Sequence, residues 1–284
     1  MRKHTMGLLA MAAASTLALS ACGGGEVGEP TGGDDTAAGG GDTIRIGIKY
    51  DQPGLGLQEG DTFTGFDTDV ARYVADKLGY SEDQIEFVET ISANRETALQ
   101  NGDVDMIFAT YSINDERKEL VSFAGPYFVA GQDLLVAADN TDIKGPEDLE
   151  GKNLCSVTGS TSAENIKTQY SEGVQLVERG GYAECATALA SGAVDAVTTD
   201  DIILAGLAAT EENAGKFKVV GAPFSEERYG VGLPKDSDQC EDINAAITEM
   251  IEDGTWEELV TANTEGADYT PNPDLNPPTP DACA

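Results

Sequence analysis

A chain of 284 residues is long enough for one large hydrophobic core or two modest ones. Lysine and arginine total 17 against 51 aspartate and glutamate residues, so the formal net charge is −34. Nucleic acids and anionic membrane surfaces bind basic faces, and an acid excess of this size argues against both as partners. An anionic small ligand is not excluded, because a few buried cations can control a pocket whatever the outer surface carries.

Residues 1–22 have the pattern of a bacterial export signal. A charged start precedes an apolar run over 8–19, which is too short to span a bilayer. The segment Leu19–Cys22 resembles the lipobox at which bacterial lipoproteins are cut and lipidated, so we expect Cys22 to carry lipid. Residues 23–42 are rich in glycine and lack apolar periodicity, which predicts a flexible tether holding a soluble domain near a membrane.

The next segment alternates between predicted strands and helices. A strand near 43–48 is followed by a helix that Asp67 or Thr68 can cap, and then by a second strand over 85–88. A further helix and strand follow. This order predicts a parallel sheet with helices on its faces.

One unit of the sequence appears twice, as Ala-Leu-x-x-Gly-x-Val-Asp at 98–105 and again at 188–195. Each copy predicts the end of a helix, a glycine stop and the start of a buried strand. The strands lead into small polar clusters at 110–112 and 199–201. Ligands of open α/β sheets bind beyond the carboxyl ends of strands, so we expect these clusters to form two facing walls of one binding site.

A second, smaller α/β lobe is expected to be inserted in the first. A buried strand over 134–138 restarts the pattern of strands and helices, and 229–233 is typical of a strand that returns to the first lobe. We therefore expect lobe 1 to comprise 43–134 with 229–284, and lobe 2 to comprise 135–228. The two crossings between them make a two-stranded hinge.

Four cysteines follow the export signal, and an even number outside the membrane favours disulfides over free thiols. Three pairings are open from sequence. We prefer Cys155 with Cys185 and Cys240 with Cys283, because the other pairings would tie the two lobes together. Zinc is not expected, since the chain has no Cys-x-x-Cys motif and its single histidine is His4 in the export signal.

Two motifs resemble one known family. The segment 65–78, which opens Gly-Phe-Asp-Thr-Asp-Val, resembles the signature of the family 3 extracellular solute-binding proteins, the polar amino-acid receptors of ABC importers. The segment 110–128 resembles that family's ligand loop, and with the inserted lobe the resemblance covers about 42–262. It implies a two-lobe clamp of the type II periplasmic-binding-protein class. Such a protein is a monomer without cofactor or metal that hands an amino acid to a membrane permease.

The resemblance also implies which residues bind the α-carboxylate of the ligand. Arg117 is the expected anchor, because a guanidinium offers two parallel donors that match two carboxylate oxygens. Thr110 and Ser112 would contribute a backbone group and a hydroxyl from the same wall. Thr161 and Ser162 would complete the site from lobe 2, at a helix start whose free backbone N–H groups favour an anion.

The remaining expected contacts concern the ligand's ammonium and its side chain. Asp200 matches the acid that pairs with the α-ammonium, with Asp201 as the alternative one position on. Arg95 and Lys49 resemble the arrangement in glutamate receptors, where the arginine reaches the side-chain carboxylate. The expected ligand is therefore glutamate, with aspartate or glutamine next.

The predicted class is a lipid-anchored binding protein on the extracellular face of the bacterial membrane. Two other classes are alternatives. An enzyme on the same fold, such as a dehydratase or a cell-wall lytic enzyme, is disfavoured. The chain has no Gly-x-Ser-x-Gly elbow, and its only histidine lies in the export signal. The sequence does not distinguish a transport receptor from a sensor lipoprotein that uses the same clamp without transport.

Overall fold

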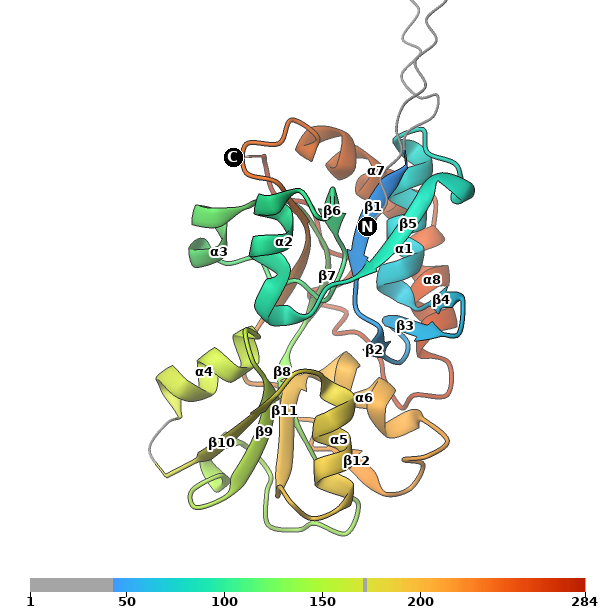
Figure 1. Ribbon diagram of the computed structural model, residues 1–284. Coiled ribbons are helices and arrows are strands. Elements are labelled where there is room, and N and C mark those ends of the chain that lie inside the picture. Colours follow the sequence, from blue (N-terminus) through green and yellow to red (C-terminus); the bar gives the residue numbers. More distant parts are fainter. Residues whose placement is uncertain (1–42, 171–172, 284) are drawn as a thin grey trace, which may run out of the picture. The chain divides into compact units, whose positions relative to one another are not determined.

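The computed structural model describes residues 43–170 and 173–283 (Figure 1). The expected export signal, the lipid site at Cys22 and the tether lie outside these residues. Within them, two five-stranded sheets carry helices, and a small three-stranded sheet adjoins the first. No helix in the described part of the chain is both long and apolar enough to cross a membrane.

The first lobe contains both parallel and antiparallel strands. Its strands are β1 (Ile44–Ile48), β2 (Asp51–Gln52), β3 (Gly56–Glu59), β4 (Thr62–Thr64), β5 (Ile85–Glu89), β6 (Met106–Ile107), β7 (Ser122–Ala130) and β13 (Glu227–Leu233). Its helices are α1 (Phe66–Lys77), η1 (Glu82–Gln84), η2 (Ser92–Asn94), α2 (Arg95–Asn101), α3 (Asp115–Leu120), α7 (Cys240–Glu252) and α8 (Thr255–Thr264). The main sheet has the order β5-β1-β6-β13-β7, with β13 antiparallel to both neighbours.

The second lobe has the same kind of sheet. Its strands are β8 (Gln132–Ala137), β9 (Asn153–Val157), β10 (Gln175–Arg179), β11 (Ala196–Asp200) and β12 (Phe217–Val219). Its helices are η3 (Pro146–Asp148), α4 (Thr161–Gln169), α5 (Tyr182–Ala190) and α6 (Asp201–Ala209). The order is β10-β9-β11-β8-β12, in which β9 runs parallel to β10 and β11.

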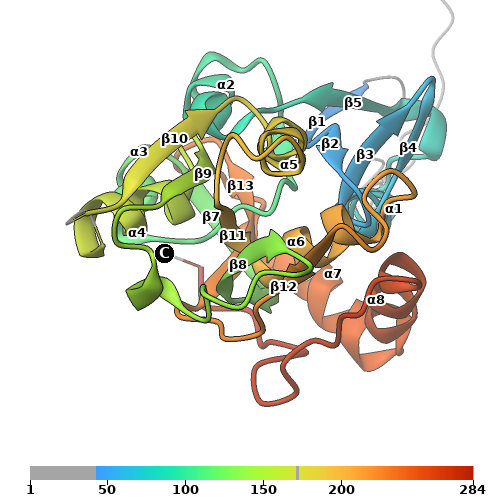
Figure 2. The ribbon, with the colours of Figure 1, turned by 90° about the horizontal axis from the view of Figure 1, so that it is seen from below.

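The chain passes from lobe 1 to lobe 2 at Gly131, between β7 and β8, and returns between β12 and β13 (Figure 1). The second sheet therefore starts at Gln132, before the boundary at 134 that the sequence suggested, and β13 starts at Glu227 rather than at 229. Both differences arise because hydrogen bonding extends each strand beyond its apolar run. The segment after α8 runs along the hinge, where the side chain of Asn276 pairs with the backbone of Val129 (Figure 2).

Each copy of the repeated unit ends a helix as expected. Gly102 after α2 and Gly192 after α5 have positive φ angles of 69° and 71°, which a residue with a Cβ adopts only with strain. Each glycine N–H donates to a carbonyl near the end of its helix. The chain then turns back into the sheet as β6 or β11.

The last aspartate of each copy connects the unit to its sheet. Asp105 Oδ2 accepts from the backbone N–H of Arg45 at 2.8 Å, and Asp195 Oδ2 accepts from that of Asn153 at the same distance. Arg45 and Asn153 lie at the start of the strand beside each unit, β1 and β9. The repeat is therefore structural: it attaches β6 to β1 in lobe 1 and β11 to β9 in lobe 2.

Helix α1 differs from the sequence prediction at its N-terminus. We expected Asp67 or Thr68 to cap it, but its N-cap is Gly65 and both polar residues are buried in the first turn. The first N–H groups of α1 donate instead to backbone carbonyls of Gly54 and Leu55. Because the helix needs no side-chain cap, the carboxylate of Asp67 is free to bond elsewhere.

Two disulfides connect Cys155 to Cys185 and Cys240 to Cys283, which is the pairing preferred from the sequence. The first joins β9 to α5 within lobe 2, and the second joins α7 to the end of the chain within lobe 1. In the chain-entropy model, loops of 30 and 43 residues contribute about 3.5 to 4 kcal/mol each. Neither bond crosses between the lobes, so neither restricts the hinge.

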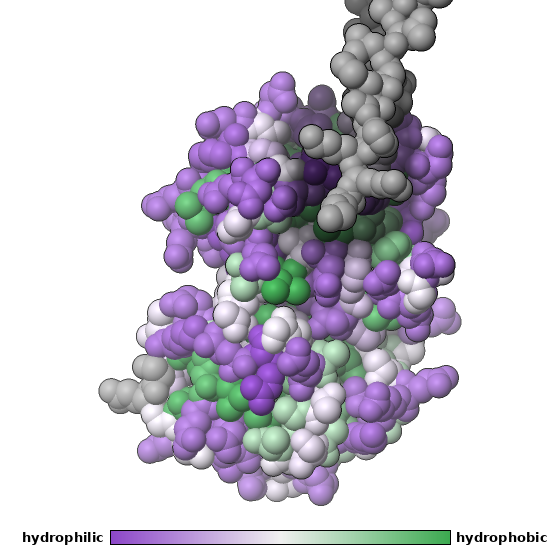
Figure 3. Space-filling view, viewed as in Figure 1, coloured by the Kyte–Doolittle hydropathy of each residue, from purple (hydrophilic) through white to green (hydrophobic). Residues whose placement is uncertain are grey.

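The core of lobe 1 is built around aromatic side chains on the hinge side. Phe66 packs against both Tyr127 and Phe128, and Trp256 of α8 packs against Phe66 and Phe128. The indole N–H of Trp256 donates to the carbonyl of Tyr127 at 2.8 Å. The outer surface is hydrophilic over most of the face seen in Figure 3, as the acid excess requires.

Candidate functional site

The two polar clusters that follow the repeated units meet between the lobes. Thr110 lies beyond β6 in lobe 1, and Asp200 is the last residue of β11 in lobe 2. Asp200 is only 3% exposed, and Tyr229 of β13 donates its hydroxyl to Asp200 Oδ2 at 2.5 Å. This bond joins the strand returning to lobe 1 to the wall formed by lobe 2.

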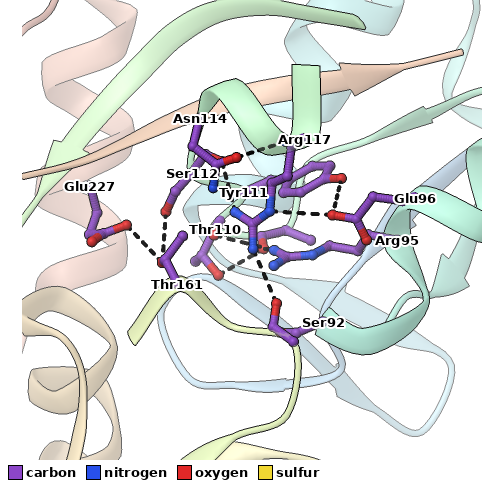
Figure 4. A network of polar contacts seen from close by, with 12 residues as sticks. Ser92, Arg95, Glu96, Thr110, Tyr111, Ser112, Asn114, Arg117, Thr161 and Glu227 are labelled. Atoms are coloured by element: carbon purple, nitrogen blue, oxygen red, sulfur yellow. Dashed lines mark hydrogen bonds and ion pairs between the residues drawn. The ribbon is translucent and has the colours of Figure 1, made fainter. Parts of the chain in front are cut away.

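Arg117 lies at the centre of the lobe 1 wall (Figure 4). Asn114 caps α3 by accepting from the backbone N–H of Arg117 at 2.8 Å. The guanidinium donates to the carbonyl of Ser112 at 2.7 Å and to that of Gly159, in lobe 2, at 3.1 Å. Its Nε lies 3.3 Å from Glu96 Oε1. At 7% exposure, Arg117 is a buried charge positioned at the lobe boundary and not a surface residue.

Arg95 is the first residue of α2 and is buried against the same wall. Its Nη1 donates to the carbonyl of Ala109 at 2.9 Å, and its guanidinium lies 4.2 Å from the ring centroid of Tyr111. The guanidinium of Arg117 also lies over this ring, 4.9 Å from its centroid. Burial and the charge of Arg117 lower the pKa of Arg95 to about 10, so it remains a cation at neutral pH.

Lys49 adds a third buried cationic group at the end of β1. Its Nζ donates to Ser92 Oγ at 2.8 Å. Burial, together with the charges of Arg95 and Arg117, lowers the pKa of Lys49 to about 7. Three basic side chains therefore converge in one buried region, and this arrangement favours an anionic ligand group.

Asp67, which does not cap α1, holds Thr110 in place. The backbone N–H of Thr110 donates to Asp67 Oδ2 at 2.7 Å, and Tyr127 donates its hydroxyl to Asp67 Oδ1. Thr110 has a positive φ of 46°, which is uncommon for a residue with a branched side chain. The N–H of Thr110 is therefore already bonded, because Asp67 is buried beneath the loop.

The lobe 2 wall is formed by the start of α4. Ser160 caps this helix by accepting from the N–H of Ala163 at 3.0 Å, which leaves Thr161 and Ser162 in the first turn. Thr161 Oγ1 lies 3.4 Å from Ser112 Oγ across the boundary between the lobes and donates to Glu227 Oε2 at 2.8 Å. The hydroxyls expected from opposite walls are therefore within contact of each other.

Asp200 faces the site, whereas its neighbour Asp201 does not. Ser162 Oγ lies 3.4 Å from Asp200 Oδ1. Burial and the nearby charge of Glu227 raise the pKa of Asp200 well above its usual value, and an approaching cation would favour its ionised form. Asp201 Oδ1 accepts instead from the backbone of Gly131 and from the hydroxyl of Tyr269, at the hinge. Of the two adjacent acids, Asp200 lies beside the other candidate residues and Asp201 lies at the hinge.

The sequence profile of the bacterial extracellular solute-binding proteins, family 3, matches residues 44–263. This chain belongs to that family. It is 46% identical over 269 residues to the glutamate-binding protein GluB of Corynebacterium glutamicum, and the match covers 90% of this chain and 88% of that protein. It is 40% identical over 222 residues to the ABC transporter glutamine-binding protein GlnH of Bacillus subtilis, covering 77% and 80% of the two chains.

Solved structures show the same fold as this family 3 solute-binding protein. An ancestral arginine-binding protein bound to arginine superposes with a TM-score of 0.71 at 37% identity, and the match covers 78% of this chain and 97% of that one. The expected two-lobe clamp of the type II periplasmic-binding-protein class is thereby confirmed, as is the family resemblance found in the sequence.

The eight candidate binding residues of this family 3 solute-binding protein lie around one buried region. The lobe 1 wall holds Lys49, Arg95, Thr110, Ser112 and Arg117, and the lobe 2 wall holds Thr161, Ser162 and Asp200. Sequence reasoning missed Glu96, Glu227, Asp67 and Tyr229, all of which bond directly to candidate residues. Two of them had a visible signal: Asp67 lies in the motif at 65–78, and Glu227 is a charge at the edge of an apolar strand. Among the described residues, no cluster of three or more histidine, cysteine or acidic side chains could hold a metal ion.

Proposed function

We propose that this protein is the lipid-anchored receptor of an ABC importer that captures glutamate between its lobes and delivers it to a membrane permease. The observation that carries the proposal is the charge arrangement of the site. Lys49, Arg95 and Arg117 converge on the lobe 1 wall, whereas Asp200 lies on the opposite wall. An acidic amino acid carries two carboxylates and one ammonium, and this distribution complements it.

Each wall would bind a different part of the ligand. Arg117, with the hydroxyls of Ser112 and Thr161, would hold the α-carboxylate, while Asp200 would hold the α-ammonium. Arg95 and Lys49 would then receive the side-chain carboxylate. The contacts are divided between the lobes, so only the closed state satisfies all of them, and the ligand shifts the hinge equilibrium toward closure.

The names of similar proteins support this ligand class. The relative in Corynebacterium glutamicum is a glutamate-binding protein, and that in Bacillus subtilis is a glutamine-binding protein of an ABC transporter. Delivery to a permease and lipid attachment at Cys22 rest on the family and on the lipobox-like segment 19–22. Binding rather than catalysis is proposed, because the site complements a zwitterion and the similar proteins carry binding-protein names.

Calorimetry with glutamate, aspartate, glutamine, histidine and arginine tests the proposal. We expect glutamate to bind most tightly and the basic amino acids to bind weakly. The variant Asp200→Asn should weaken the binding of every amino acid, because all share the α-ammonium. The variant Arg95→Ala should weaken acidic ligands most and leave the binding of the basic amino acids unchanged. Equal losses from both variants, or tighter binding of arginine than of glutamate, would show that the roles are wrongly assigned.

The affinity for glutamate is expected to fall as the pH rises through about 7, the pKa to which burial lowers Lys49. A carboxylate beside the ammonium raises that pKa, so the complex binds more protons than the free protein and loses affinity on the alkaline side. Lys49→Arg should flatten this alkaline limb, because a guanidinium keeps its charge up to a pH of about 12. Calorimetry over the neutral pH range checks this. The same loss of affinity with rising pH in the variant as in the wild type would contradict it.

A further inference from the structure

Two buried donor atoms in the described part of the chain have no hydrogen-bond partner. They are Gln52 Nε2 and Arg95 Nε. Almost all buried polar groups in folded proteins are satisfied, because leaving one unpaired costs its full desolvation penalty. Both atoms carry N–H groups, so the group that would satisfy them is a hydrogen-bond acceptor.

The two unpaired donors border the same residue. The hydroxyl of Thr110 lies 3.3 Å from Gln52 Oε1 and 2.8 Å from the carbonyl of Ala109, and both oxygens are acceptors for it. Arg95 Nη1 lies 2.9 Å from the carbonyl of Ala109 and 3.4 Å from that of Thr110. In the amide orientation of this structure the oxygen of Gln52 faces Thr110, and its NH₂ group has no partner.

Gln52 is enclosed by the contact between the lobes. Its side chain is 0% exposed, although it lies on β2 in the short segment that follows β1. Both of its neighbours touch lobe 2: Asp51 Oδ2 accepts from the N–H of Ala183 at 3.4 Å, and Pro53 packs against Gly206 of α6. An acceptor that pairs with Gln52 is therefore one that the closing lobes enclose with it.

We propose that Gln52 is a ligand-contacting, specificity-determining residue whose NH₂ group, together with Arg95 Nε, donates to the oxygen atoms at the end of the ligand's side chain. The inference rests on the proposed function and adds a residue to it. Two donors select amino acids that end in a carboxylate or a carboxamide oxygen. A side chain that ends in a cation would leave both donors unpaired and would meet three basic groups.

The test is calorimetry of the whole protein with glutamate and glutamine, comparing Gln52→Glu with Gln52→Leu. Gln52→Leu should lose about tenfold or more in glutamate affinity, the effect of one hydrogen bond to a charged group. Gln52→Glu keeps the shape and the acceptor for Thr110 but replaces the donor by a negative charge. This variant should weaken the binding of glutamate far more than that of glutamine, because the amide of glutamine can donate to the new carboxylate.

Gln58→Leu is the matched control, because Gln58 is exposed on the neighbouring strand β3, and it should bind like the wild type. Thermal unfolding shows whether each variant is folded. If Gln52→Leu does not fold, the glutamate and glutamine affinities of Gln52→Glu decide the outcome. The inference is overturned if Gln52→Leu retains wild-type affinity or if Gln52→Glu weakens glutamate and glutamine equally. Absence of glutamate binding by the wild type would instead refute the proposed function.

Discussion

Arg117→Ala is expected to raise the Kd for glutamate by at least about 100-fold, which corresponds to about 3 kcal/mol. The guanidinium is buried at the lobe boundary and donates to carbonyls of both lobes, at Ser112 and Gly159. Its loss removes the proposed α-carboxylate anchor and one of the cross-lobe bonds of the closed state. All amino-acid ligands should be affected alike, since all carry an α-carboxylate.

Arg117→Lys separates charge from geometry. A lysine keeps the positive charge but cannot present two parallel donors, so we expect a smaller loss that is still at least about tenfold. Calorimetry with the same ligand panel measures both variants. Wild-type affinity in Arg117→Lys would show that charge alone holds the carboxylate.

A stability control is needed, because Arg117→Ala also leaves Glu96 without its cation. The double variant Arg117→Ala/Glu96→Gln removes the unpaired charge and keeps an acceptor for the hydroxyl of Tyr111, which lies 2.8 Å from Glu96 Oε1. We expect its thermal stability to recover toward the wild type while binding remains lost. Recovery of binding would show that Arg117 acts through stability rather than through ligand contact.

Gly206→Ala is expected to stabilise the protein without ligand and to weaken binding. Gly206 lies inside α6, where alanine is favoured over glycine by about 1 kcal/mol. A Cβ at this position would collide with the carbonyl oxygen of Pro53 in lobe 1. Closure would be obstructed, and we expect the Kd for glutamate to rise at least about tenfold, in proportion to the lost closed population.

The opposite signs of these two effects make the experiment informative. Thermal unfolding without ligand should show an equal or higher midpoint, whereas calorimetry should show the weaker binding. Gly180→Ala is the matched control in the same lobe, because a Cβ there meets only the flexible end of Glu184, at 3.3 Å. If Gly206→Ala binds glutamate as tightly as the wild type, the contact with Pro53 is not part of the ligand-bound state.

Two other glycines support the same view of lobe closure. A Cβ on Gly159 would lie 2.7 Å from Cα of Ala93, and one on Gly181 would collide with the carboxylate of Asp51. Each belongs to a different segment of lobe 2, and each faces lobe 1. The close approach of the lobes therefore depends on the absence of side chains at Gly206 and Gly159, where a Cβ would meet backbone atoms, whereas the carboxylate of Asp51 can move away from position 181.

Local patterns were sufficient to predict much of the fold. The glycine stops at Gly102 and Gly192, the apolar strands after them and the inserted lobe all follow from short-range periodicity and turn chemistry. The cap of α1 could not be predicted in this way, because its N–H groups are satisfied by the backbone of Gly54 and Leu55. Such a partner belongs to the tertiary structure, and the polar residues Asp67 and Thr68 only resembled a cap.

The sequence by itself determined which chemical groups stand at the ends of β6 and β11, and the motifs at 65–78 and 110–128 indicated the family. Only the tertiary structure decided how those groups are paired. Glu96 approaches Arg117, Asp67 takes the N–H of Thr110, and Gln52 keeps an unpaired donor. The physical reason is that burial and hydrogen bonding are set by segments distant in sequence. A linear pattern identifies a charge, but only packing determines whether that charge is satisfied or left for a ligand.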